Sequence, residues 1–164
     1  MSVLAILEKL ERMHKSLLEL ANKKTVVIKA NDIEALDELI KTEQAHIAAI
    51  NTLEQQRQLM VTDYLRAKGI AYTDNPTVTE LIDAIDNNEE KQQLSATRER
   101  LLTLLTELKV QNDLNQKLVY QSLQIINIQL EPFRPQRSDS FNYSGDEVRG
   151  QSNQRKVTYY DSQA

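Results

Sequence analysis

The sequence predicts an all-α protein: an elongated antiparallel bundle or coiled coil of three long helices and one short helix, followed by a disordered C-terminal tail. Glycine and proline are scarce, with three of each in 164 residues, so long helices can run without interruption. Apolar residues recur every three or four positions, which is the spacing of helices packed lengthwise. The β-branched and aromatic runs between Gly-rich turns that indicate strands are missing. We therefore expect a helical domain over residues 1–131 and a tail over 132–164.

The first two long helices are predicted from their apolar rows and their end signals. The first row starts at Val3 and continues to a reset of the pattern near Asn31. Asn31 followed by Glu34 has the form of a capping box, which predicts the start of the second helix. That helix is expected to end at Gly69, because glycine favours the left-handed position just after a helix.

The short helix and the last long helix follow from similar signals. Asn75-Pro76 has the form of an N-cap followed by the first helical residue, which predicts a short helix there. The last helix is predicted over residues 89–131. It should end at Pro132, because proline cannot continue an α-helix and Pro135 follows soon after.

Three polar residues interrupt the apolar row of the last helix: Gln111, Asn112 and Asn115. Buried asparagines of this kind can fix the register between packed helices at some cost in stability. Alternatively, they mark a place where the bundle opens to receive a partner. The sequence leaves both interpretations open.

The predicted tail contains five of the chain's eight aromatic residues, Phe133, Phe141, Tyr143, Tyr159 and Tyr160. Burying so few large side chains releases less free energy than ordering the whole tail costs in conformational entropy. We therefore expect the free tail to be disordered and its aromatic residues to contact a partner surface. An inert solubilising tail is the alternative.

Composition excludes several classes of function. The formal net charge is −4 and no Lys/Arg cluster is present, so we expect no nucleic-acid partner. The chain has no cysteine, which removes disulfides and thiol chemistry. Its first residues lack the form of a signal peptide, and no apolar run reaches the roughly 18 residues of a membrane span. A cytoplasmic protein without membrane insertion is expected.

Two Glu-x-x-His pairs, Glu11/His14 and Glu43/His46, are the strongest enzymatic signal. In ferritin-like bundles this spacing puts two metal ligands on one face of a helix. Such a site also needs inward carboxylates from two further helices, and the last helix offers none in its apolar row. A phosphotransfer histidine, for which His46 is the candidate, has less support still. We expect no enzyme, no metal and no cofactor, and keep the ferritin-like bundle as a weaker alternative.

Three features resemble the FlgN family of flagellar export chaperones. The first is the order of helices, with the Glu/Gln/Arg-rich stretch 54–57 in the second helix. The second is the run 108–118, where two asparagines precede a leucine. The third is the tail, where Tyr143-Ser144-Gly145 and then Lys156-Val157 are similar to the family's Tyr…Gly…Lys ending.

The resemblance implies a cytoplasmic chaperone that binds C-terminal helices of hook-associated subunits, prevents their premature assembly and delivers them to the export gate. A client helix needs a long apolar groove, which the last helix offers. We place client contact at Leu101, Leu108, Asn112, Asn115, Leu118 and Val119. Docking on the export gate is placed at Phe141, Tyr143, Tyr159 and Tyr160, with Tyr143 the candidate by resemblance. A generic coiled-coil scaffold is the competing interpretation, and whether the free protein is a monomer or a homodimer stays open.

Overall fold

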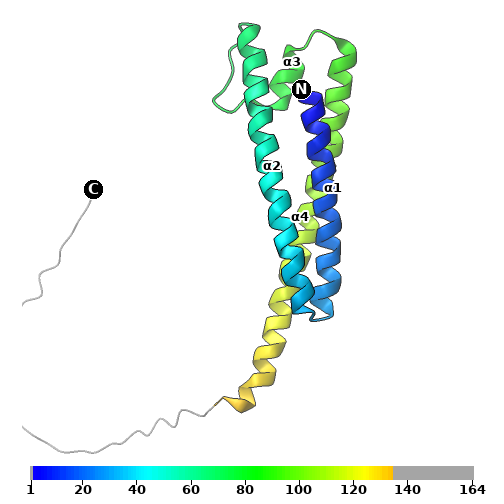
Figure 1. Ribbon diagram of the computed structural model, residues 1–164, viewed down its shortest axis with the longest axis vertical. Helices are drawn as coiled ribbons and strands as arrows, with labels where there is room; N and C mark the ends of the chain where they lie inside the picture. The colour runs from blue at the N-terminus through cyan, green and yellow to red at the C-terminus, as the bar shows by residue number, and fades with distance from the viewer. Residues whose placement is uncertain (1, 135–164) are drawn as a thin grey trace, which may run out of the picture. The chain divides into compact units, whose positions relative to one another are not determined.

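The computed structural model describes residues 2–134 (Figure 1). Within that part the chain forms four α-helices and one 3₁₀ helix, and no strand: α1 (Val3–Lys29), α2 (Ile33–Ala67), α3 (Val78–Ala84), α4 (Asn88–Leu130) and η1 (Glu131–Phe133). All four α-helices lie in one compact unit, which ends at Pro132. The predicted all-α class with three long helices and one short helix is confirmed for this part of the chain. From residue 135 onward the predicted tail lies outside the described residues.

The three long helices alternate in direction, so α1 and α2 form an antiparallel hairpin and α4 runs parallel to α1 (Figure 1). Partners on α1 and α4 keep a constant offset in sequence: Arg100 bonds Glu11, 89 residues away, and Thr25 bonds Asn115, 90 residues away. α1 packs on both α2 and α4. In the described residues the backbones of α2 and α4 nowhere approach as closely. Successive long helices are therefore antiparallel, as predicted, and the first and third are parallel, as this alternation requires.

The start of α2 lies one residue later than the predicted cap. Asp32, not Asn31, is the N-cap residue, and its carboxylate accepts a hydrogen bond from the backbone N–H of Ala35 at 3.0 Å. Asn31 has a φ of 54°, a left-handed conformation that asparagine adopts more readily than most residues. Asn31 thus reverses the chain after α1, which leaves the capping role to Asp32.

The start of α3 also differs from the prediction. Thr77 is the N-cap residue, two positions beyond Asn75, and it forms a capping box with Glu80. The backbone N–H of Glu80 donates to the Thr77 hydroxyl at 3.2 Å, and the backbone N–H of Thr77 donates to the Glu80 carboxylate at 2.6 Å. Gly69 follows α2 with a φ of 67°, so the predicted end of that helix is confirmed.

The core is packed most tightly at the end of the bundle where α3 lies between α2 and α4 (Figure 1). Large apolar side chains from all four helices are at most 1% exposed there: Ile6, Leu7, Leu10, Val61, Leu65, Leu81 and Leu94. Toward the α1–α2 turn the buried residues are fewer and slightly more exposed, as at Leu20 (8%) and Ile28 (5%). Because apolar burial is the main stabilising contribution, the α3 end holds the bundle together.

An ion pair between α1 and α4 predicts a pH dependence of stability. Arg100 donates to both carboxylate oxygens of Glu11, at 2.8 and 3.0 Å. These hydrogen bonds hold the pKa of Glu11 below its ordinary value of 4.5. A depressed folded-state pKa means that the pair stabilises the fold above the unfolded-state pKa, and that this contribution is lost as the pH falls through the folded-state pKa.

We therefore expect Glu11→Gln to lower the melting temperature at neutral pH, with a difference from the wild type that shrinks in acid. Melting curves recorded by circular dichroism across this pH range measure the effect. Glu19→Gln, at an exposed position on the same helix, is the matched control and should change little. A difference that stays constant into acid would contradict the assignment.

Candidate partner-binding site

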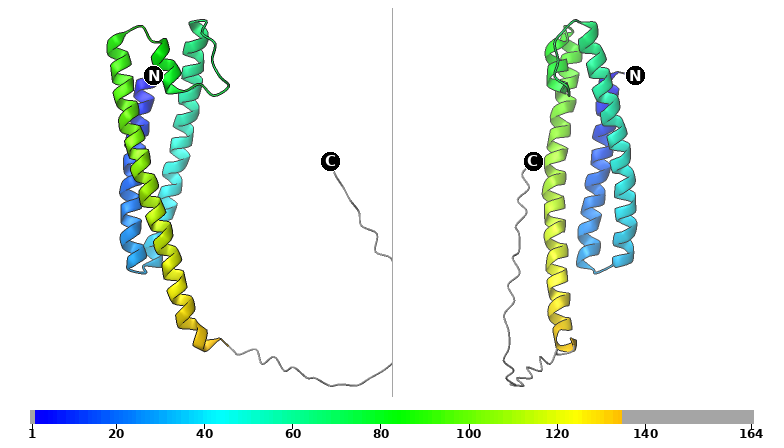
Figure 2. Two further views of the ribbon diagram at one scale, coloured as in Figure 1. Left: turned by 180° about the vertical axis from the view of Figure 1, so that it is seen from behind. Right: turned by 90° about the vertical axis from the view of Figure 1, so that its left-hand side faces the viewer.

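Helix α4 is longer than the helices on which it packs. The offsets of the pairs Glu11–Arg100 and Thr25–Asn115, 89 and 90 residues, place Lys29, the last residue of α1, level with about Val119. α4 continues to Leu130 and extends past the turn between α1 and α2 (Figure 2). We call residues 119–130 the arm. At about 1.5 Å per residue the arm is roughly 18 Å long.

The arm is apolar and exposed. No charged residue occurs from Leu118 to Leu130, although Lys117 and Glu131 flank this stretch. The large apolar side chains of the arm are exposed to solvent by 37% (Val119) to 67% (Ile128). The exposed large apolar side chains of the arm are Val119, Tyr120, Leu123, Ile125, Ile126, Ile128 and Leu130. Exposed apolar side chains gathered in this way are typical of interaction surfaces.

Apolar side chains lie on more than one side of the arm. Val119, Leu123, Ile126 and Leu130 are spaced by four, three and four residues, so they share one face. Ile128 lies on the opposite side, because nine residues from Val119 correspond to about two and a half turns. The polar residues of the arm, Gln121, Ser122, Gln124, Asn127 and Gln129, are uncharged and lie between these apolar side chains around the helix. The arm therefore has one apolar face of four residues and single apolar side chains on its other sides.

At the base of the arm, α4 and the end of the α1–α2 hairpin enclose an apolar hollow of about 180 Å³, which we call the notch. Three segments line it: Val27 and Ile28 at the end of α1, Asn31, Asp32, Ile33 and Leu36 from the turn into α2, and Val119, Ser122, Leu123 and Ile126 from the arm. Most of these side chains are aliphatic. The notch is therefore suited to an apolar group.

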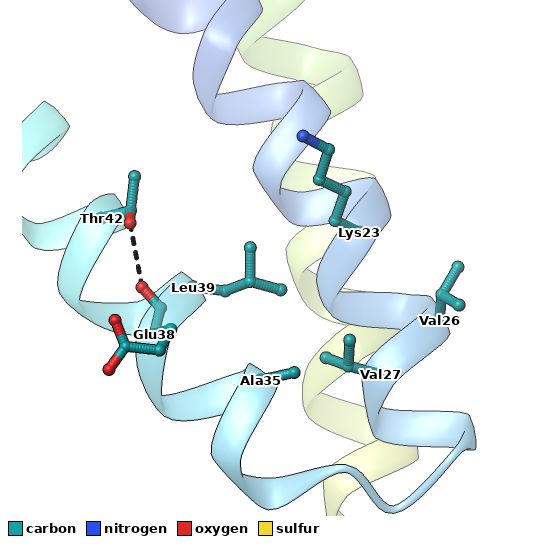
Figure 3. A pocket seen from close by; sticks show the side chains of 7 residues that line it. All are labelled: Lys23, Val26, Val27, Ala35, Glu38, Leu39 and Thr42. Atoms are coloured by element: carbon teal, nitrogen blue, oxygen red, sulfur yellow. Dashed lines mark hydrogen bonds between the residues drawn. The ribbon is translucent and has the colours of Figure 1, made fainter.

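A second, more open hollow of about 450 Å³ lies between α1 and α2 (Figure 3). Its lining residues are Lys23, Val26 and Val27 on α1, and Ala35, Glu38, Leu39 and Thr42 on α2. In Figure 3 the side chains of Val27, Ala35 and Leu39 point into the space between the two helices. The Thr42 hydroxyl is directed back to its own helix and donates to the Glu38 carbonyl at 2.9 Å. Apolar surface at this end of the hairpin is thus accessible between α1 and α2 as well as beside the arm.

The six residues predicted to contact a client lie at different depths. Leu101 and Leu108 are half-buried against the core, Leu118 is half-buried, Asn115 is 3% exposed, and Asn112 and Val119 are exposed. Val119 alone belongs to the arm. Two arm residues, Ile125 and Ile126, continue the same apolar row in the sequence. Periodicity did not reveal that this part of the row is uncovered, whereas the uncharged stretch 118–130 is a sequence signal that could have done so.

The polar residues in the middle of α4 bond to α1. The side-chain amide of Asn115 donates to the backbone carbonyl of Ala21 at 2.7 Å, and its oxygen accepts from the Thr25 hydroxyl at 2.5 Å. Gln111 donates to the same Thr25 hydroxyl. Asn112 is exposed, outside this cluster. The contacts of Asn115 and Gln111 are those expected of a register-setting cluster, since they fix α4 at one offset along α1.

Removing the amide of Asn115 should destabilise the bundle. Asn115→Ala leaves buried polar groups on α1 without their partner, so we expect the free energy of unfolding to fall by about 1–3 kcal/mol. Urea denaturation followed by circular dichroism measures this change. The matched control is Asn112→Ala, three residues earlier and exposed, which should change stability by less than about 0.5 kcal/mol. Equal effects of the two substitutions would contradict the register role.

The two Glu-x-x-His pairs serve contacts within the bundle. Glu11 and Glu43 each pair with a cation on a neighbouring helix. His14 and His46 each donate from Nδ1 to a carbonyl of their own helix, at 2.8 and 2.9 Å, and the Ser16 hydroxyl donates to Nε2 of His46 at 2.9 Å. In the described part of the chain no three His, Cys, Asp or Glu side chains gather where they could hold a metal ion.

None of the described helices combines the length and apolar composition needed to span a membrane. The sequence matches the family described as FlgN protein over residues 1–149. It is 32% identical, over 167 residues that cover both chains completely, to the uncharacterized protein YvyG of Bacillus subtilis (strain 168). No solved structure matches the chain. Because the family match covers most of its length, the chain belongs to the FlgN family.

Proposed function

We propose that this protein is a cytoplasmic flagellar export chaperone that holds a C-terminal helix of a hook-associated subunit against its arm. Membership of the FlgN family supports the role of flagellar export chaperone. The chaperone would keep the subunit from assembling early and deliver it to the export gate. No catalytic step is part of this proposal.

The observation that carries the proposal is the uncovered, uncharged arm. An amphipathic guest helix can pack its apolar face along another helix, with contacts through side chains at i, i+3, i+4 and i+7. Val119, Leu123, Ile126 and Leu130 present this spacing. A guest whose apolar face is occupied in this way has no free face for assembly with other subunits.

The proposed contact surface moves along α4 from the position expected from sequence alone. Val119 remains in it, and Asn112 is exposed but lies about two turns before the arm. Asn115 is buried on α1, and Leu101, Leu108 and Leu118 are half-buried. Contact with Asn115 would require the guest to separate α4 from α1, and the three leucines offer a guest only part of their surface. A guest on the arm needs no such opening.

The arm is suited to a carrier that must release its cargo. It is only about three turns long. A guest segment that orders on binding gives up roughly 2–5 kcal/mol of contact energy in doing so. We therefore expect micromolar binding. For delivery we keep Phe141, Tyr143, Tyr159 and Tyr160 as the proposed contacts with the export gate.

The test is direct binding of the full chain to synthetic peptides from the C-terminal helices of hook-associated subunits. Calorimetry should give saturable binding with one peptide per chain, and a scrambled peptide of the same composition should not bind. Light scattering on the same samples reports the assembly state. A chain that forms a stable dimer alone and binds no such peptide would instead be a scaffold.

A further inference from the structure

We propose that the notch receives one bulky apolar side chain of the guest helix, and that this anchor sets where along the guest the chaperone binds. The inference rests on the proposed function, since it assigns a specific contact to the guest on the arm. It adds a requirement on the guest: one of its large apolar residues must face the end of the α1–α2 hairpin while its neighbours lie on the arm.

The dimensions of the notch fit a single side chain. Its volume is about 180 Å³. A dry protein cavity of about 150 Å³ lined by aliphatic and aromatic residues accommodates benzene. A phenyl or isobutyl group therefore fits the notch, whereas two large side chains do not. Such a group would contact α1, α2 and α4 together, through Ile28, Leu36 and Leu123.

The chemistry of the lining selects an apolar anchor. The one carboxylate in the lining belongs to Asp32, and it already accepts the hydrogen bond of the α2 N-terminus. Asn31 and Ser122 are the other polar residues of the lining, and the remaining seven residues are aliphatic. A charged group in the notch would therefore lose most of its hydration against aliphatic side chains. Leucine, methionine and phenylalanine are the residues expected at the anchor position.

The arm by itself is too small for a stable pair of identical chains. Stable interfaces use about 20–30 residues on each side, and the arm provides residues 119–130. A guest helix instead gains from one side chain buried in a pocket, which is typical of the hot spots of binding energy. A transient complex can form on a smaller interface than a stable dimer needs, so the arm is large enough for a guest helix. A guest helix, not a second copy, is therefore the occupant that we assign.

The absence of cysteine from the sequence allows a direct test of the contact. Ser122→Cys introduces one thiol in the notch, and guest peptides carry one cysteine at each apolar position in turn. We expect a disulfide with one guest position only, and none at that position with the exposed neighbouring variant Gln121→Cys. Equal crosslinking at every guest position would overturn the proposal. So would Ser122→Cys chains that crosslink to each other without guest, because a second copy would then occupy the notch.

Affinity provides an independent measurement. Ser122→Leu fills the notch from α4, and we expect about 10- to 100-fold weaker guest binding, the loss for one large apolar contact. A guest whose anchor is replaced by alanine should bind the wild type equally weakly and lose nothing further on Ser122→Leu, since both changes remove the same contact. If Ser122→Leu binds the unmodified guest like the wild type, the anchor in the notch is ruled out, while guest binding on the arm is not. If the wild type binds no guest peptide, the proposed function itself fails.

Discussion

Replacing Leu123 with aspartate should abolish guest binding while leaving the helical fold intact. Leu123 is 54% exposed and lies on the arm, at the border of the notch. A carboxylate there would be covered by the apolar face of a guest, and an unpaired buried charge costs several kcal/mol. A penalty of about 3 kcal/mol corresponds to more than 100-fold in the dissociation constant. Calorimetry with a guest peptide measures the loss, and circular dichroism checks the fold.

A matched substitution elsewhere separates this effect from a general loss of apolar surface. Leu59 on α2 is 65% exposed and lies outside the arm and both hollows. Leu59→Asp adds the same charge at a similarly exposed leucine, so we expect its guest affinity to equal that of the wild type. Equal losses for the two variants, or no loss for Leu123→Asp, would rule out the arm as the binding surface.

The order of helices follows from the sequence, but two of the three helix starts after α1 required the structure. Gly69 ends α2 as predicted, because only a residue tolerant of positive φ fits there easily. Asn31 and Asp32 are both good capping residues, and local propensity does not choose between them. The choice falls to Asp32 because Asn31 takes the left-handed conformation that the turn requires.

The arm could not be located from periodicity, because exposure depends on which helix ends first. After the polar residues Gln111, Asn112 and Asn115, the apolar row of α4 resumes at Leu118 and runs to Leu130, with the three- and four-residue spacing that it also has where it is covered. What differs is that α1 stops at Lys29. The position of Lys29 along α4 is fixed by tertiary contacts such as Thr25 with Asn115. The sequence suggested a register-setting role for Asn115, but not the offset that it sets.

The same limit applies to the Glu-x-x-His pairs. Spacing alone places Glu11 and His14 on one helix face. Whether they form a site depends on the groups that face them from other helices. Arg100 faces Glu11 and binds it with two hydrogen bonds. The carboxylate thereby serves as a link between α1 and α4.

A leucine truncated in the core should lower the free energy of unfolding but leave guest affinity unchanged, whereas a leucine truncated on the arm should do the reverse. Leu10 is 0% exposed, at the tightly packed end of the bundle, so Leu10→Ala should lower the free energy of unfolding by about 2–5 kcal/mol. Leu123→Ala removes the same atoms from an exposed site and should change that free energy by less than about 0.5 kcal/mol. Urea denaturation of both variants gives the comparison.

Guest binding should show the reverse order. Leu10 lies near the α3 end of the bundle, away from the arm, so Leu10→Ala should bind the guest normally as long as it is folded. Leu123→Ala loses a contact that only the guest completes, and about a 10-fold weaker affinity is expected. If both substitutions weakened binding in proportion to their effect on stability, the arm would depend on the core for its conformation. If instead Leu10→Ala changes only stability and Leu123→Ala changes only guest affinity, the residues that stabilise the fold and those that bind the guest lie in separate parts of the molecule.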